Sequence, residues 1–273
     1  MSGGQFDWLM YAHREDLLIN KNISANALLT KIEFGDDADI DYGWYKAFAG
    51  VLNLRSIAVP SDDLLKNTAI PNCKSLKYLT IPSGVTAMPD ISNFGQLKKV
   101  SIPKSAISSY ILTNCSALDS VTIPSSVTSI GNNAFKNCSI LTAVTIPSSV
   151  TSIGNNAFDS CLGLASVTIP DSVTSIGSNA FVSCTSLLTV KIPNSLTSVG
   201  NSAFQNCYNI YLYDFTSWTT ADLDACTFGT NIFNGLMNGT QIMFKYKSVA
   251  VHAESVSNLA AYSAYFAFEE DDT

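Results

Sequence analysis

Hydrophobic and polar residues alternate in short stretches that recur along the chain at intervals of just over twenty residues. Most of these stretches end in an apolar residue followed by proline, and the prolines are spaced by 22, 21, 21, 23, 23 and 23 residues: Pro60, Pro82, Pro103, Pro124, Pro147, Pro170 and Pro193. Three further stretches fit the same template without the proline, at Leu28–Phe34, Asn209–Phe215 and Gly239–Phe244. A repeat of this length predicts a solenoid, because one unit is too small to bury its apolar face alone.

Within one unit, the apolar residues Leu164, Val167 and Ile169 are interleaved with Ser166 and Thr168. This period of two predicts a short strand that is buried on one face. The proline that follows has no N–H to donate, so it ends the strand.

The rest of the unit, SVTSIGSNAFVSC at Ser172–Cys184, predicts a turn followed by one short helical turn. We expect Gly177 to adopt a positive φ and Asn179 to cap the helical turn. The inner side of the unit then carries Val173, Ile176, Ala180, Phe181 and Cys184. Together the units predict an α/β repeat solenoid, a right-handed superhelix with a parallel sheet on one side and short helical turns and strands on the other.

The pattern L-x-x-V-x-I-P followed by S-V-T-S-I-G-x-x-A-F-x-x-C resembles the BspA-like branch of the leucine-rich repeat proteins. The match is strongest from Cys115 to Cys207 and weaker in the units around Pro82 and Pro103, which lack the IGxxAF segment. The resemblance implies a curved solenoid that serves in adhesion or protein binding, commonly on microbial surfaces.

Both ends of a stacked core need a cover. Apolar residues at helical spacing predict an amphipathic helix at Gln5–Leu18 and a second helix at Ser255–Phe268. The irregular stretch Thr216–Asn238 is either part of the C-terminal cap or a contact surface. The predicted organisation is an N-terminal helical cap at 1–25, about nine repeats of 21–25 residues at 26–215, and an irregular last repeat with the C-terminal cap at 216–273.

One position of the repeat is occupied mainly by cysteine, at Cys73, Cys115, Cys138, Cys161, Cys184 and Cys207. Positions that recur at a constant interval stack into a column along a solenoid. Val51 and Phe94 occupy the same position in other units, so it accepts a hydrophobic residue. We therefore favour buried free thiols over disulfides between neighbours, and a linear column is a poor metal site because metal ligands converge on one point. Cys226 lies outside this spacing.

Composition narrows the classes of partner. Only 14% of the residues are charged, and the net charge is −7 with no run of basic residues, so nucleic acid is not expected. The acidic segment Glu269–Asp272 is interpreted as a solvated tail. The N-terminal sequence lacks a basic segment followed by an apolar one, and no stretch approaches about 18 apolar residues, so neither a signal peptide nor membrane insertion is expected.

Candidate catalytic groups are scarce. The two histidines, His13 and His252, lie in the two terminal regions, and no nucleophile elbow or phosphate-binding glycine loop is present. We therefore expect no enzyme, cofactor or metal. The acidic segment Asp36–Asp41 has carboxylates at alternate positions, as in a calcium loop, but it lacks that loop's glycine and distal glutamate. A solvated loop is the preferred interpretation there, with calcium binding as the alternative.

A solenoid commonly binds its partner on the outward face of its parallel sheet. In the middle repeats this face is predicted to carry mainly small hydroxyl residues, so larger and charged side chains toward the two ends are the candidates for binding. These candidates are Lys31, Glu33, Tyr78, Lys99, Lys191, Leu212, Asp214 and Trp218.

The sequence thus predicts a non-enzymatic protein-binding or adhesion module associated with a microbial or viral surface. The alternative hypothesis is a structural subunit of a phage or virion, such as a decoration or tail/fibre protein. The expected partners are a protein or glycan on a cell surface, or sister subunits of an assembly. The expected location is extracellular, at a cell surface or on a virion.

Overall fold

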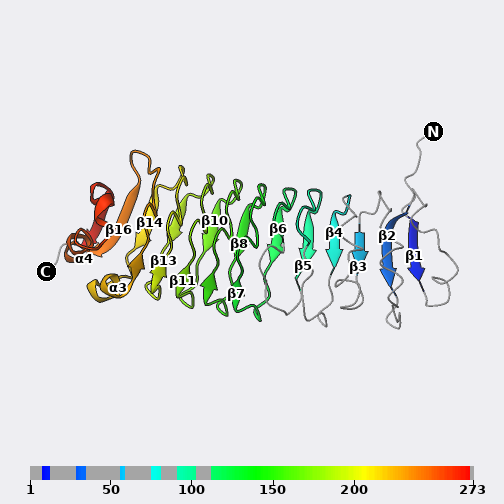
Figure 1. Cartoon of the computed structure of the whole chain (residues 1–273), viewed down its shortest axis with the longest axis horizontal. Helices are drawn as coiled ribbons and strands as arrows, with labels where there is room; N and C mark the ends of the chain where they lie inside the picture. Colours follow the sequence, from blue (N-terminus) through cyan, green and yellow to red (C-terminus); the bar gives the residue numbers. More distant parts are fainter. Residues whose placement is uncertain are drawn as a thin grey trace.

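A computed structural model of the 273-residue chain describes residues 8–12, 29–34, 56–58, 75–80, 91–102 and 112–270. Its elements follow one another along the long axis in sequence order, from β1 to the C-terminal helix α4 (Figure 1). For the first three strands only the backbone is described.

The main sheet is built from one short strand per repeat. Its strands are β1 (Trp8–Ala12), β2 (Leu29–Phe34), β3 (Ser56–Ala58), β4 (Tyr78–Thr80), β5 (Lys99–Ser101), β6 (Ser120–Thr122), β8 (Ala143–Thr145), β10 (Ser166–Thr168), β12 (Thr189–Lys191), β14 (Leu212–Phe215), β16 (Gln241–Tyr246) and β17 (Phe266–Glu270). Hydrogen bonds pair them in parallel as β1 to β6, β8 with β10, and β12 to β17, and further contacts join β6 to β8 and β10 to β12. The prediction of a parallel-strand solenoid is therefore confirmed.

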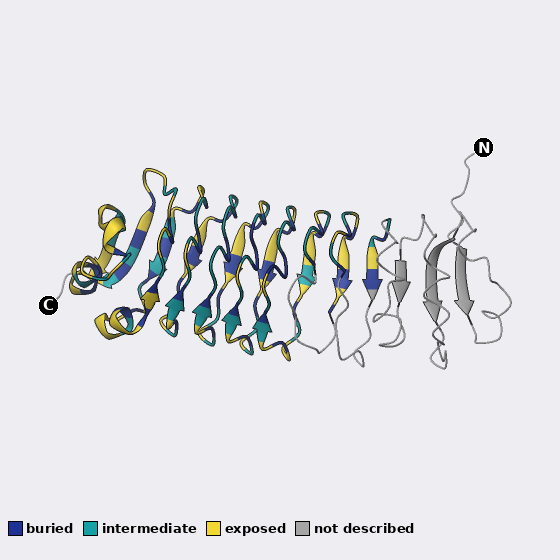
Figure 2. Cartoon of the chain, viewed as in Figure 1, coloured by how far each residue is buried: buried dark blue, intermediate teal, exposed yellow. Residues whose placement is uncertain are grey.

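The strand of each repeat lies where the alternating pattern predicted it. In β10, Val167 is buried between the exposed residues Ser166 and Thr168, and the same pattern holds in β5, β8 and β12. Figure 2 shows this alternation of buried and exposed residues along the row of strands. The outward face of the sheet is thus set by the sequence.

A second parallel sheet runs along the other side of the solenoid. Its strands are β7 (Ser129–Ile130), β9 (Ser152–Ile153), β11 (Ser175–Ile176), β13 (Ser198–Val199) and β15 (Thr227–Phe228). In the four repeat units the second residue of each strand, an isoleucine or valine, is buried. Strands on this side were predicted, and they form from the SI or SV dipeptide of the repeat.

The prediction of a short helical turn after this strand is wrong. Asn179 and Ser183 have φ values of 57° and 59°, in the left-handed region that asparagine tolerates better than most residues. Between Asn179 and Cys184, alternate N–H groups donate to the next repeat and the remaining ones donate three residues back: Phe181 N–H bonds Ala203 O at 2.8 Å, and Cys184 N–H bonds Phe181 O at 3.2 Å. The segment is a chain of turns whose hydrogen bonds join neighbouring repeats.

Gly177 has a different role from the one predicted. Its φ is not positive; among the described residues the glycines with a positive φ are Gly235 and Gly239. A Cβ atom at Gly177 would lie 2.6 Å from Asn155 N and 2.6 Å from Gly154 C of the preceding repeat. Glycine is required here because two backbones approach closely.

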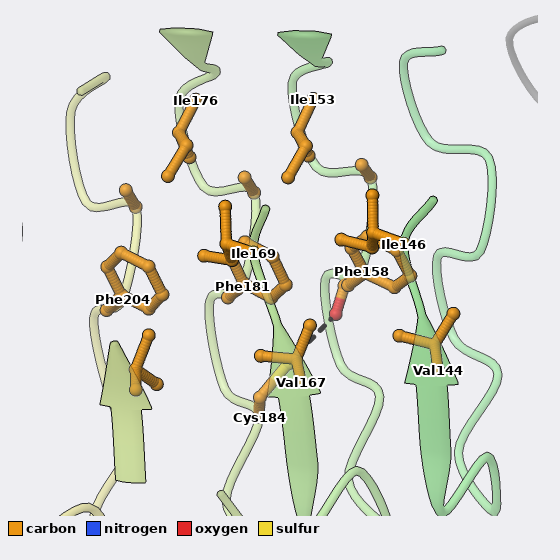
Figure 3. Packing of buried hydrophobic residues seen from close by; sticks show 14 of the residues in the cluster. Val144, Ile146, Ile153, Phe158, Val167, Ile169, Ile176, Phe181, Cys184 and Phe204 are labelled. Carbon is orange, nitrogen blue, oxygen red and sulfur yellow. Dashed lines mark hydrogen bonds between the residues drawn. The ribbon is translucent and has the colours of Figure 1, made fainter. Parts of the chain in front are cut away.

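Aromatic side chains stack along the interior. The rings of Phe135, Phe158, Phe181 and Phe204 are buried, with centroids 5.1 Å apart at each step and nearly parallel planes. Figure 3 shows the last three of them in the core. Their spacing follows the spacing of the strands, about 4.8 Å. The repeat therefore forms one continuous core.

The cysteine position forms a column of buried free thiols, as predicted. Each thiol donates to a main-chain carbonyl of the preceding repeat, at 3.1–3.4 Å; the pairs are Cys115–Ile91, Cys138–Leu112, Cys161–Phe135, Cys184–Phe158 and Cys207–Phe181. Burial raises the pKa of Cys207 to about 12 and that of Cys184 well above its usual value, so both thiols stay protonated and can donate. Cysteine thus combines a small apolar volume with a hydrogen-bond donor. Cys73 lies outside the described residues.

The ends of the solenoid differ from the predicted helical caps. At the N-terminus, strand β1 occupies the centre of the predicted helix Gln5–Leu18 and pairs in parallel with β2. Pairing with β2 satisfies backbone groups along the strand, and this tertiary contact outweighs the helix propensity of Leu9, Met10 and Ala12. The prediction of an N-terminal helix is therefore wrong over these residues.

The single C-terminal helix predicted at Ser255–Phe268 is also wrong. Its second half forms the 3₁₀ helix η4 (Ala260–Tyr265) and the start of β17, which pairs with β16. Two short α-helices, α3 (Thr220–Ala225) and α4 (Lys247–Ala253), complete this end. Pairing with β16 gives the Phe266–Glu270 backbone hydrogen bonds that a longer helix would have had to supply internally. Among the described residues no helix has the length and apolar character needed to span a membrane.

Candidate binding surface

The outward face of the main sheet carries two rows of side chains, which follow from the pairing of the strands. Residues of one row lie beside each other in the order Tyr78, Lys99 and Ser120, then Ala143 and Ser166, then Thr189, Leu212 and Gln241. The middle of the sheet presents small residues, as predicted.

Three lysines and a tyrosine form a compact block on β4 and β5, which we call the Tyr78–Lys99 block. Tyr78 pairs with Lys99 across the two strands, and Lys98 N–H donates to Lys77 O at 2.8 Å, so the two residues that precede the strands are also neighbours. The side chain of Tyr78 is 47% exposed, Lys98 and Lys99 are exposed, and Lys77 is half-buried. The fold therefore brings together two positions that the sequence predicted as binding residues.

A shallow groove of about 400 Å³ lies on this block. It runs from Tyr78 and Lys99 across β5 to β6, and its lining also includes Ser101, Thr122 and Pro124. The groove thus combines an aromatic ring, an ammonium group and hydroxyl groups, and its lining also includes the largely buried residues Leu79, Val100 and Ile102.

The electrostatics of the block are unbalanced. In the described part of the chain, the ammonium groups of Lys77, Lys98 and Lys99 form no ion pair. Asp119 occupies the position of the next repeat that follows Lys77 and Lys98, since its N–H donates to Lys98 O at 3.3 Å. The carboxylate of Asp119 accepts a hydrogen bond from Ser120 Oγ at 2.9 Å. Three cations thus face solvent beside one carboxylate.

The candidates near the other end are not grouped in this way. Lys191 is exposed on β12, while Leu212 and Asp214 are half-buried on β14. The carboxylate of Asp214 accepts hydrogen bonds from Thr216, at 2.8 Å from the backbone N–H and 2.6 Å from the hydroxyl. Asp214 therefore stabilises the turn that follows its strand.

Trp218 does not belong to the surface, and this prediction is wrong. Its side chain is 2% exposed and packs against Phe215 and Phe228, with ring centroids 5.2 and 5.7 Å away. Its indole N–H donates to Ile192 O at 2.7 Å, which satisfies the polar end of the ring inside the core. The side chains of the remaining candidates, Lys31 and Glu33, lie outside the described residues, as does the acidic segment Asp36–Asp41.

A second exposed feature was missed by the sequence analysis. Large apolar side chains lie in the loops that precede β8, β10, β12 and β14, each between 45% and 57% exposed; we call them the corner row, and they are Ile140, Leu162, Leu188, Tyr208 and Tyr211. They occupy positions one, two or four residues after the column cysteine, where other repeats carry small or polar residues such as Ser139, Gly163 and Asp119. That departure from the repeat was the signal available in the sequence.

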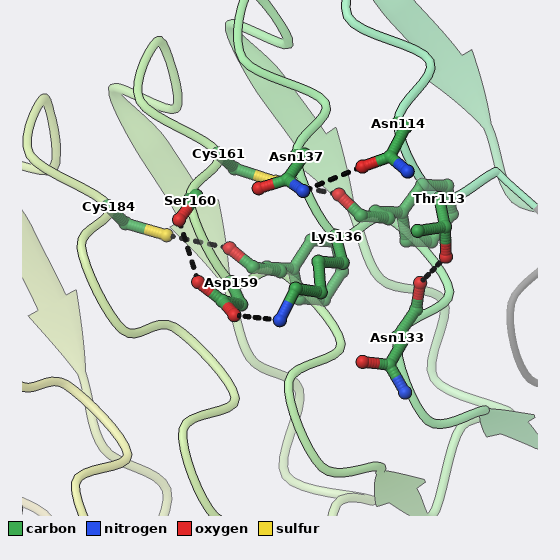
Figure 4. A network of polar contacts seen from close by, with 11 residues as sticks. Thr113, Asn114, Asn133, Lys136, Asn137, Asp159, Ser160, Cys161 and Cys184 are labelled. Atoms are coloured by element: carbon green, nitrogen blue, oxygen red, sulfur yellow. Dashed lines mark hydrogen bonds and ion pairs between the residues drawn. The ribbon is translucent and has the colours of Figure 1, made fainter. Parts of the chain in front are cut away.

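Polar groups on the turns are used to hold the repeats together. Asn137 Nδ2 donates to Asn114 Oδ1 at 2.6 Å, and Lys136 forms an ion pair with Asp159 at 2.7 Å (Figure 4). The described residues contain no group of three His, Cys, Asp or Glu side chains that could hold a metal ion. The polar network in Figure 4 links neighbouring repeats through hydrogen bonds and an ion pair.

Comparison with known proteins is consistent with this architecture. The sequence model described as BspA type leucine rich repeat region matches residues 18–108 and 105–236 with six copies, which together span most of the chain. The chain belongs to the BspA-type leucine-rich repeat family. No curated protein matches this BspA-type chain.

Several solved structures of bacterial proteins are similar to it. A leucine-rich repeat protein from T. pallidum is 24% identical, with a TM-score of 0.42 over 70% of this chain and 85% of that chain. One from Bacteroides ovatus is 19% identical, with a TM-score of 0.40 over 89% and 84%. The pneumococcal vaccine antigen PcpA is 15% identical, with a TM-score of 0.42 over 89% and 70%.

Proposed function

We propose that this BspA-type chain is a non-enzymatic binding module that serves in adhesion at a microbial or viral surface. The observation that carries the proposal is the Tyr78–Lys99 block on the outward face of the sheet. The exposed ring of Tyr78 and the ammonium group of Lys99 line its groove. Two further cations that form no ion pair within the described residues, Lys77 and Lys98, lie next to these residues along the two strands. Tyrosine is typical of binding surfaces, and a scaffold whose backbone is already ordered lowers the cost of binding. The lysines add electrostatic complementarity to a negatively charged partner.

The rest of the outward face supports a spacer role for the middle repeats. From β8 to β10 the face presents Ala143, Thr145, Ser166 and Thr168, which offer neither charge nor aromatic surface. A partner that contacts the sheet is therefore expected to gain most of its binding energy at the block.

The experiment that tests this proposal measures attachment of the fluorescently labelled chain to a panel of microbial and animal cells by flow cytometry. The double variant Tyr78→Ala/Lys99→Gln is expected to lower the cell-bound signal at least about fivefold, because it removes an aromatic anchor and a charge. The control Ser166→Ala/Thr168→Ala changes the same face in the middle of the sheet and is expected to bind normally. Absence of binding to every cell type, or equal binding by both variants, contradicts the proposal.

A second candidate function is that of a structural subunit in a phage or virion assembly, and the corner row favours it. Large exposed apolar side chains in the loops of four consecutive repeats are typical of surfaces that other subunits cover. If this function holds, light scattering after size-exclusion chromatography will show a defined oligomer that dissociates in the variant Leu188→Ser. A monomer at every concentration contradicts it.

A further inference from the structure

We propose that the Tyr78–Lys99 block binds an acidic polysaccharide. This inference rests on the proposed binding function and names the chemical class of the partner. It follows from the charge of the block, from the groove beside it, and from the hydrogen bonding of the strands that carry it.

The charge of the block is opposite to that of the chain. The protein has a net charge of −7, yet Lys77, Lys98 and Lys99 lie at neighbouring positions of two consecutive turns. Like charges on neighbouring positions repel each other, and no carboxylate in the described part of the chain pairs with them. The cations therefore do not stabilise the fold, and their grouping favours an anionic ligand.

The groove supplies the contacts that a sugar unit needs. A sugar ring has an apolar face, which can stack on the exposed ring of Tyr78, and hydroxyl groups at its edge. The hydroxyl of Thr122 and the ammonium group of Lys99 line the same groove and can bond those hydroxyls. A carboxylate or sulfate on the sugar would form a charge-assisted hydrogen bond with a lysine.

The strands of the block argue against an acidic peptide. Extended peptides are often recognised by addition to an open sheet edge, through main-chain hydrogen bonds. Here β4 is paired with β3 and β5, and β5 is paired with β4 and β6, so neither strand offers an edge. A ligand of this block must be recognised through side chains, which suits a polysaccharide.

The test is biolayer interferometry of the full chain on immobilised heparin and on immobilised polygalacturonate, at 50 to 300 mM NaCl. Heparin presents sulfates and polygalacturonate presents carboxylates, so the two probes separate the sources of the negative charge. Lys98→Gln and Lys99→Gln are each expected to weaken binding to at least one probe about threefold to tenfold. The triple variant Lys77→Gln/Lys98→Gln/Lys99→Gln is expected to reduce the slope of log affinity against log salt by about 2, because each lost contact removes released counterions.

The aromatic contact and the location need their own controls. Tyr78→Ala is expected to weaken binding without changing the salt slope, since it removes no charge. Lys191→Gln removes the same charge from the same face at β12 and is expected to change affinity less than twofold. Equal loss in Lys191→Gln and Lys99→Gln would show that only the overall charge matters, and the proposal would then be wrong. Circular dichroism melting of each variant checks that the fold is retained.

The remaining outcomes separate this inference from the proposed function. Equally tight binding to immobilised polyglutamate overturns the polysaccharide in favour of an acidic peptide. If Tyr78→Ala/Lys99→Gln abolishes cell attachment while neither polysaccharide binds, this inference is wrong and the binding function stands. If the chain binds neither cells nor polysaccharides, both are wrong.

Discussion

The column of buried thiols predicts that the protein loses stability in mild alkali. Burial raises the pKa of the column thiols Cys138, Cys161, Cys184 and Cys207, and also that of the buried Cys226 outside the column, above the pKa of a free thiol. The raised pKa is about 12 for Cys207 and for Cys226. An unfolded cysteine has a pKa of about 8.5. Above that pH the unfolded chain releases protons that the folded chain retains, so the free energy of unfolding falls as pH rises through about 8.5 toward the folded values.

The size of the effect follows from the number of thiols. At pH 9.5 most unfolded thiols are ionised, which lowers the free energy of unfolding by about 1 kcal/mol for each thiol that stays protonated in the folded state. Five such thiols together give a loss of roughly 5 kcal/mol or more between pH 7.5 and 9.5. A typical domain has a free energy of unfolding of about 5–15 kcal/mol, so this loss would be a large part of the total.

The assay is urea unfolding at pH 7.5, 8.5 and 9.5 in the presence of a phosphine reductant, followed by tryptophan fluorescence. The matched control is Cys161→Ala, which removes one thiol from the middle of the column. This variant is expected to be less stable at pH 7.5, because it loses a hydrogen bond and leaves a small cavity. Its further loss between pH 7.5 and 9.5 should be smaller than that of the unmodified chain by about 1 kcal/mol. Equal losses in the two proteins would refute the role assigned to the thiols.

Two further predictions concern the core. In the part of the chain that the structure describes, the hydroxyl of Tyr213 is buried without a hydrogen-bond partner. Tyr213→Phe should therefore raise the free energy of unfolding by about 1 kcal/mol. A decrease would show that the hydroxyl is bonded. Gly177→Ala should destabilise by about 1–3 kcal/mol, because the added Cβ meets backbone atoms at 2.6 Å. The control Gly95→Ala places its Cβ 3.6 Å from Ser116 Oγ and should change stability far less; equal effects in urea unfolding would contradict the close approach inferred at Gly177.

The strands were predictable because their signal is local. In β10 the alternation of Ser166, Val167 and Thr168 and the proline that follows specify both the position of the strand and its buried face. The same signal located Tyr78 and Lys99 on the outward face, and the parallel pairing of β4 with β5 brought them together.

The errors arose where distant contacts decide the local structure. Asn179 was predicted to cap a helical turn, but its N–H donates to Asn201 O of the next repeat and its backbone is left-handed. Trp218 was predicted on the surface, but the carbonyl of Ile192, 26 residues earlier, accepts its indole N–H within the core. Neither contact is visible in the residues around the position. Of the Tyr78–Lys99 block, Lys77 and Lys98 were not among the predicted binding residues, because both precede the alternating residues of their strands and become neighbours through stacking of the repeats.

The most direct test of the account is lysine footprinting by acetylation and mass spectrometry, on the chain alone and in contact with cells or with the polysaccharide that it binds. The account predicts that Lys98 and Lys99, which are exposed in the free protein, become protected when the partner binds. Lys191, on the same face at β12, and Lys136, on the turns, should react equally in both states. Protection of Lys191 or Lys136 with full reactivity at Lys98 and Lys99 would contradict the assignment of the binding surface to the Tyr78–Lys99 block.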